Sequence, residues 1–132
     1  MNNDSFIEYK ETQTTMIPHT PIDLYVQAVD MAKEKEGLSN QDKLLLNRFK
    51  MLLRSGAVED ADSEIARMGK VRKKTLHNLR ELAESIFEDW VRNLDTDDAE
   101  REKILREGKQ RAKYAEEHMI NELQFLGLVT EN

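Results

Sequence analysis

The sequence predicts an all-α protein, in which a small helical N-terminal bundle is followed by a long antiparallel helical hairpin. Only five glycines and two prolines occur in 132 residues, so breaks in regular structure are few. Hydrophobic residues make up 39% of the chain and charged residues 35%, a balance that favours narrow apolar stripes on helices over a thick sheet core. Beyond residue 19, apolar residues recur at helical spacing in most segments.

The composition also limits the classes of function. The chain contains no cysteine, which excludes disulfides and thiolate metal sites and fits a reducing compartment. No apolar run approaches the roughly 20 residues of a membrane span, and residues 1–10 lack the apolar core of a secretory signal. We therefore expect a cytoplasmic protein without membrane contact. Because the net charge is −6, nucleic-acid binding requires positive charge to be concentrated locally.

The chain is expected to begin with an arm and a capped helix. Residues 1–19 show no clean hydrophobic period, and we interpret them as a flexible or docking arm, with a short edge strand over residues 6–12 as the alternative. Thr20 is a good capping residue and Pro21 suits the first helical position. Gly37 is expected to end this first helix.

The second helix is expected to be the central core helix. Ser39 is its capping residue, and Asp42 follows three positions later in a capping-box arrangement. Seven large apolar residues then occur among the ten positions 44–53. Ser55 and Gly56 are expected to end this second helix. A short third helix is expected over residues 63–68, and Gly69 is expected to end it.

Two long helices are expected to complete the chain, at about residues 72–93 and 98–126. The polar turn between them is so short that the helices should pack antiparallel. The last helix carries an apolar stripe with steps of four and three residues, which is an eleven-residue repeat. Within this stripe Gly108, Ala112 and Ala115 are small, so a neighbouring helix is expected to approach closely there.

Such a hairpin is expected to project beyond so small a core and to expose its apolar side chains unless another chain covers them. We therefore expect a homo-oligomer assembled through residues 81–132, with residues 20–80 forming a separate helical domain. The residues expected to form an interface, with a second copy of the chain or alternatively with a partner protein, are Phe87, Trp90, Val91, Ile104, Gly108, Ala112, Ala115 and Met119.

Residues 63–80 carry the one pattern that indicates a specific activity. The relevant positions are Glu64-Ile65-Ala66, Gly69, Val71 and Thr75-Leu76. They resemble the bacterial helix-turn-helix pattern Glu-Ile-Ala-x-x-Leu-Gly-Val-x-x-x-Thr-Val, and the separations from Ile65 to Val71 and to Thr75 match it. The glycine falls one place early, so Lys70 stands where the family has its glycine.

This resemblance implies a DNA-binding segment whose second helix enters the major groove. The layout is also similar in outline to the small terminase subunits of tailed phages and to small helical phage and plasmid regulators. The local charge agrees, because six cations and no acid lie between residues 65 and 80. The expected DNA contacts are Arg67, Lys70, Arg72, Lys73, Lys74, His77, Asn78 and Arg80.

Two other interpretations stay open. In the first, the basic run is only a solvated face. In that case the protein is an acidic helical adaptor or inhibitor, which binds a host or partner protein without contacting nucleic acid. The pairs His77/Glu81 and His118/Glu122 have metal-compatible spacing, but we interpret them as ordinary surface pairs and expect no metal or cofactor. No nucleophile elbow or glycine-rich phosphate loop is present in the sequence, so we expect no enzymatic activity.

Overall fold

Helices dominate the computed structural model, which describes residues 20–55, 65 and 68–130. Within these residues the order is α2 (Pro21–Ala32), α3 (Asn40–Ser55), β1 (Val71–Arg72), α5 (Lys73–Arg92), α6 (Asp98–Phe125) and β2 (Val129–Thr130). The all-α fold class is therefore confirmed. The expected arm over residues 1–19 lies outside the described residues, as do four of the six residues of the expected third helix.

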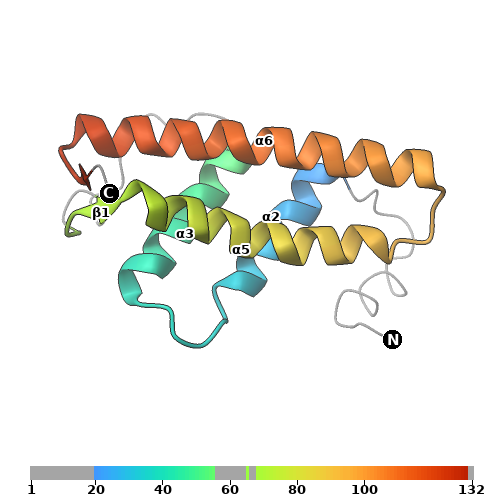
Figure 1. Ribbon diagram of the computed structural model, residues 1–132, viewed down its shortest axis with the longest axis horizontal. Coiled ribbons are helices and arrows are strands. Elements are labelled where there is room, and N and C mark those ends of the chain that lie inside the picture. Colours follow the sequence, from blue (N-terminus) through green and yellow to red (C-terminus); the bar gives the residue numbers. More distant parts are fainter. Residues whose placement is uncertain (1–19, 56–64, 66–67, 131–132) are drawn as a thin grey trace.

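Helices α5 and α6 form the expected antiparallel hairpin, which runs the length of the molecule in Figure 1. Asp97 caps α6 by accepting a hydrogen bond from the backbone N–H of Glu100 at 2.8 Å. A Cβ atom built on Gly108 would lie only 2.3 Å from Cζ of Phe87. The two helices thus approach closely at this glycine, as the small-residue stripe predicted.

Helices α2 and α3 begin at the expected caps. Thr20 Oγ1 accepts from the backbone N–H of Asp23 at 3.0 Å. Ser39 and Asp42 cap each other, because each side chain accepts from the other residue's backbone N–H, at 3.0 and 3.1 Å. The expectation that Gly37 ends the first helix is wrong, because α2 ends at Ala32; Gly37, with a left-handed φ of +91°, lies in the connection between the two helices.

One cluster of buried side chains runs through all four described helices. Helix α2 packs against α3, α5 and α6, and it crosses the hairpin obliquely in Figure 1. The Tyr25 ring lies 4.7 Å from the Phe87 ring and 6.1 Å from the Phe49 ring, measured between centroids. The domain boundary expected after residue 80 falls inside α5, and the buried cluster is continuous across it.

A parallel pair of two-residue strands, which the sequence did not predict, joins the end of the chain to the start of α5. Val71 pairs with Val129 and Arg72 with Thr130. Gly127, with a φ of +75°, ends α6 in a Schellman motif, in which Leu128 N–H bonds to the carbonyl of Leu123 at 2.8 Å. The reversal brings β2 alongside β1.

The segment of the helix-turn-helix resemblance has a different local form from the one expected. Val71–Arg72 is a strand, and Gly69 does not adopt a left-handed φ. Only Ile65 and Met68 are described from the expected third helix. Ile65 is buried, and its carbonyl accepts from the backbone N–H of Met68 at 3.2 Å.

Candidate nucleic-acid interface

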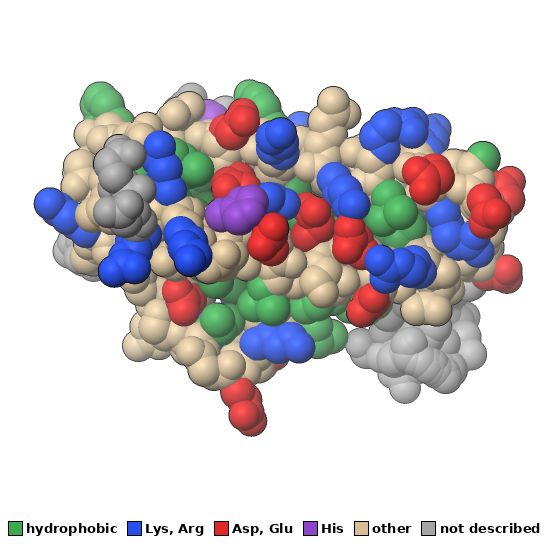
Figure 2. Space-filling view, in the orientation of Figure 1, with side chains coloured by type: hydrophobic (Ala, Val, Ile, Leu, Met, Phe, Trp, Pro, Cys, Tyr) green, Lys and Arg blue, Asp and Glu red, His purple; other side chains and the backbone are tan. Residues whose placement is uncertain are grey.

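Four cations gather where α5 begins, and we call Lys70, Arg72, Lys73 and Lys74 the basic tip. Lys70, Arg72 and Lys74 are exposed, and Lys73 is half-buried. Within the described residues none of the four forms an ion pair with a carboxylate. Figure 2 shows Lys and Arg side chains gathered at this end, whereas basic and acidic side chains are mixed along the rest of α5 and α6.

The backbone of the basic tip is held from two sides. On one side, Val71 N–H donates to the carbonyl of Leu128 at 2.8 Å within the strand pair. On the other, Gln41 Nε2 at the start of α3 donates to the carbonyl of Gly69 at 2.9 Å. Val71 is buried while Arg72 is exposed, which is the alternation expected of a strand. The fold therefore fixes the backbone and leaves the cationic side chains in solvent.

The first turn of α5 is unusual because its residues oppose the helix dipole. Arg72 occupies the N-cap position, makes no side-chain capping hydrogen bond, and is followed by no acid in the first turn. In contrast, α6 has the capping residue Asp97 and acids in its first turn. Cations at a helix N-terminus each cost about 0.3–1 kcal/mol at low ionic strength. A bound anion would offset this cost, since it would be attracted by both the cations and the helix N-terminus.

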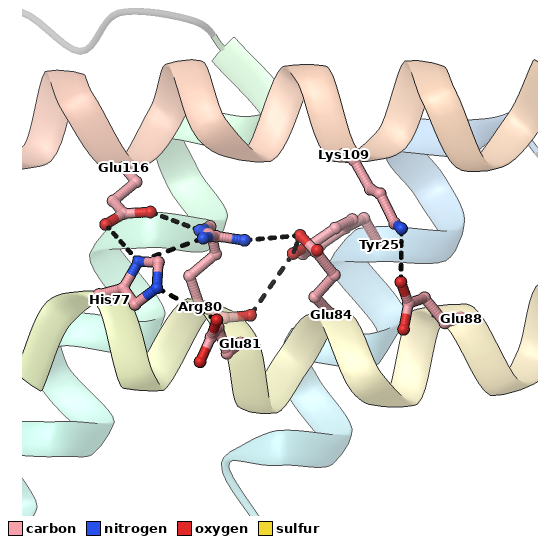
Figure 3. Close-up of polar contacts among 8 residues, drawn as sticks. All are labelled: Tyr25, His77, Arg80, Glu81, Glu84, Glu88, Lys109 and Glu116. Carbon is pink, nitrogen blue, oxygen red and sulfur yellow. Dashed lines mark hydrogen bonds and ion pairs between the residues drawn. The ribbon is translucent and has the colours of Figure 1, made fainter.

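Charged residues further along α5 are paired with one another and with α6, as Figure 3 shows. Arg80 Nη1 donates to Glu84 Oε1 at 2.8 Å, and Arg80 Nε donates to Glu116. His77 Nε2 lies 3.1 Å from Glu81 Oε2, and its Nδ1 lies 3.4 Å from Glu116 Oε2. The predicted surface pair of His77 and Glu81 is therefore confirmed. The other predicted pair, His118 with Glu122, is wrong for the described residues, because the Glu122 carboxylate accepts from Arg48 Nε at 2.9 Å instead.

The same network reaches Tyr25 of α2, and a separate ion pair joins Lys109 of α6 to Glu88 of α5. Tyr25 Oη donates to Glu84 Oε1 at 2.9 Å, and burial together with that carboxylate raises the pKa of Tyr25 well above its ordinary range. Burial alone would lower the pKa of Arg80, but Glu116 and Glu84 raise it. Lys109 Nζ lies 2.6 Å from Glu88 Oε2, and this contact raises the pKa of Lys109. These cations stay charged and are matched by carboxylates inside the protein.

The structure thus separates the residues expected to contact DNA. The four residues of the basic tip come together, and exposed Asn78 follows about one turn along α5. The prediction that Arg80 contacts DNA is wrong, because its side chain is only 14% exposed and is paired with two carboxylates rather than directed to solvent. His77 is 47% exposed but stands between Glu81 and Glu116. Arg67 lies outside the described residues.

One residue at this end escaped the sequence analysis. Phe125, the last residue of α6, is 90% exposed and is the most exposed large hydrophobic side chain in the described part of the chain. Its exposure could have been predicted from the sequence, because Phe125 lies outside the apolar stripe of this helix, whose last members are Leu123 and Leu126. The strand pair brings the chain after Phe125 back to the basic tip.

The residues expected to form an oligomer interface lie mainly inside this chain. The exposure expected for Phe87 and Ile104 is wrong, because Phe87 is fully buried beneath Tyr25 of α2 and Ile104 is 6% exposed. Trp90 is partly buried against the core. The remaining expected interface residues, Val91, Gly108, Ala112, Ala115 and Met119, are also buried. Homo-oligomerisation stays a prediction.

Comparisons with protein-family models, curated proteins and solved structures gave no significant match. Among the described helices, none combines the length and the apolar character that crossing a membrane requires. The basic tip is the most distinctive feature of the described surface.

Proposed function

We propose that this protein is a small non-enzymatic DNA-binding protein, regulatory or phage-related, that contacts DNA phosphates through the basic tip. The observation that supports this most is that Arg72, Lys73 and Lys74 stand together without carboxylate partners in the described residues. The protein as a whole carries a net charge of −6. Cations that stand together create a local positive potential, which attracts an anionic partner even when the net charge of the protein is negative.

The proposed contact is made by the start of α5 and the segment before it rather than by the length of the helix. Glu81 is 58% exposed and lies about two turns beyond Lys74, where it would repel phosphates. The usable cationic surface is therefore short. Four cations in contact with duplex phosphates predict a slope of about −3 to −4 in the logarithm of affinity against the logarithm of salt concentration.

The decisive variant replaces Arg72, Lys73 and Lys74 together with alanine. Each phosphate contact is worth about eightfold in affinity at roughly 0.1 M salt, so the loss should be about a hundredfold or more. Fluorescence anisotropy with a labelled duplex measures this loss, and circular dichroism checks that the helices remain.

A matched control removes three exposed cations from α6, in the variant Lys103→Ala, Arg106→Ala, Lys113→Ala. The net charge changes by the same amount, so a general charge effect would weaken binding equally in both variants. The proposal expects the control to bind nearly as well as the natural protein. An unchanged affinity after the change at the basic tip would contradict the proposal.

The competing function is that of an acidic adaptor, and one further surface feature favours it. An open groove lies between the start of α2 and the middle of α6, with Pro21, Ile22 and Tyr114 on its apolar walls and Glu107 and Arg111 beside them. A protein segment is a suitable occupant for such a groove. Capture from host lysate with and without nuclease treatment separates the two functions. Nuclease-resistant capture that survives the change at the basic tip would favour the adaptor.

A further inference from the structure

An exposed aromatic ring and the basic tip occupy the same end of the molecule. Phe125 is the last residue of α6, and Val71 N–H bonds to the carbonyl of Leu128, three residues further on. Three residues span at most about 11 Å even when fully extended. The backbone of Phe125 therefore lies within this distance of Leu128, which is bonded to Val71 beside the basic tip, so the ring and the cations lie at the same end of the molecule.

We propose that the ligand of the basic tip is a single-stranded nucleic acid, with one base stacked on Phe125 and the neighbouring phosphates held by Lys70, Arg72, Lys73 and Lys74. This rests on the proposed function and specifies its ligand. Proteins that bind single strands combine a positively charged surface with aromatic side chains that stack on bases. Phe125 supplies the ring, since 90% of its surface is exposed.

Two features favour a single strand over a duplex. In a duplex each base face is already covered by its neighbours, so Phe125 could stack only after base pairs were forced apart. In addition, the cationic surface is short, and a duplex lying along α5 would meet the exposed carboxylate of Glu81. A flexible single strand can follow the short path from the ring to the basic tip and end there.

An anionic lipid surface would also be attracted to the basic tip. Phe125 is a single ring at the end of a helix. The two nearby residues that belong to the apolar stripe are not free to insert, because Leu123 is buried and Leu126 is half-buried. The area available for insertion into a bilayer is therefore small. In contrast, the face of one nucleic-acid base is about the size of one phenyl ring, so a single exposed ring is enough to stack on it. The single strand is the ligand that uses both the charge and the aromatic group.

The test measures affinities for a labelled single strand of about twenty nucleotides and for a duplex of the same length. The single strand should bind at least about tenfold more tightly than the duplex. Phe125→Ala should weaken single-strand binding about tenfold, which is the loss expected for one stacked base, and leave duplex binding unchanged. Phe125→Trp should keep the affinity, since a larger ring stacks equally well. Oligothymidine and oligouridine arms distinguish a DNA strand from an RNA strand.

Tyr114→Ala is the matched control. Tyr114 is an exposed aromatic on the same helix, 55% exposed and about 16 Å along the axis from Phe125. Its removal should not change single-strand binding. If the duplex binds as tightly as the strand and Phe125→Ala changes nothing, the single-strand inference is wrong while the proposed function stands.

Two other outcomes overturn the inference in different ways. Failure of both the strand and the duplex to bind would remove the proposed function as well. Binding to vesicles that contain anionic lipid, lost in Phe125→Ala and unmatched by any oligonucleotide, would show that the ring inserts into a bilayer instead.

Discussion

The start and the middle of α5 carry the same kinds of cation in different surroundings. In the middle, Arg80 is 14% exposed and is shared between Glu84 and Glu116, so its charge is matched within the protein. At the start, Arg72 and Lys74 are exposed and have no carboxylate partner among the described residues. The difference arises because Arg80 has Glu84 four residues further along α5 and Glu116 on the facing part of α6, while β2 lies beside the start of α5.

This comparison shows that a run of positive charge does not by itself mark a binding surface. Whether a cluster of cations can bind a ligand depends on whether the fold places carboxylates next to those cations. Cations in the middle of α5 should contribute to stability, and cations at its start should contribute to binding. Substitutions in the two regions should therefore change different measured quantities.

The largest expected effect is on stability, from Arg80→Ala. The change leaves Glu116, which is 8% exposed, without its main cationic partner, and should cost about 3 kcal/mol of unfolding free energy. Urea denaturation measures this. Arg92→Ala is the control, since Arg92 is 62% exposed and its pairs should be worth no more than about 0.5 kcal/mol. Equal losses in the two variants would contradict the distinction between the regions.

The second effect is a loss of stability at alkaline pH that depends on Tyr25. Its pKa is raised in the folded state, so the phenol stays protonated there, while in the unfolded chain it ionises near pH 10. The contribution of Tyr25 is thus complete below about pH 10 and falls above it by about 1.4 kcal/mol per pH unit. Urea denaturation at about pH 9 and about pH 11 measures the change. Tyr25→Phe should remove this part of the pH dependence, and an identical pH dependence in both proteins would count against it.

The smallest expected effect has opposite signs for stability and binding. Arg72 has an extended backbone, with φ −86° and ψ 148°, as capping residues do. Arg72→Asp should therefore raise the unfolding free energy by about 1 kcal/mol while weakening nucleic-acid binding. Arg72→Ala separates loss of charge from gain of a cap, because it should weaken binding with a smaller gain in stability. A destabilised Arg72→Asp protein would show that strand pairing, rather than the first helical turn, governs this position.

The helices could be predicted because their signals are local. Thr20 with Pro21, Ser39 with Asp42, and Gly127 mark helix ends in neighbouring residues, and α6 runs from Asp98 to Phe125 against an expected 98–126. Short-range patterns of this kind need no knowledge of the tertiary structure. The polar turn between the long helices likewise predicted the antiparallel hairpin.

The features that were missed depend on contacts between distant residues. Strands of two residues show no period, so the pairing of Val71 with Val129 left no trace in the sequence. Nothing near Arg80 indicates that Glu116, 36 residues away, engages it. The burial of Phe87 required α2 to cross the hairpin, an arrangement that helical periodicity does not specify. The basic tip itself was predictable, since the sequence shows four cations close together and no acid.

The salt dependence of single-strand affinity tests the central claim most directly. Four phosphate contacts predict a slope of about −3 in the logarithm of affinity against the logarithm of salt concentration. In the variant with Arg72, Lys73 and Lys74 changed to alanine, one cation of the basic tip remains, and the slope should fall to about −1. A natural protein that binds with a slope near zero, or a slope that the substitutions leave unchanged, would contradict the assignment of the basic tip as the nucleic-acid interface.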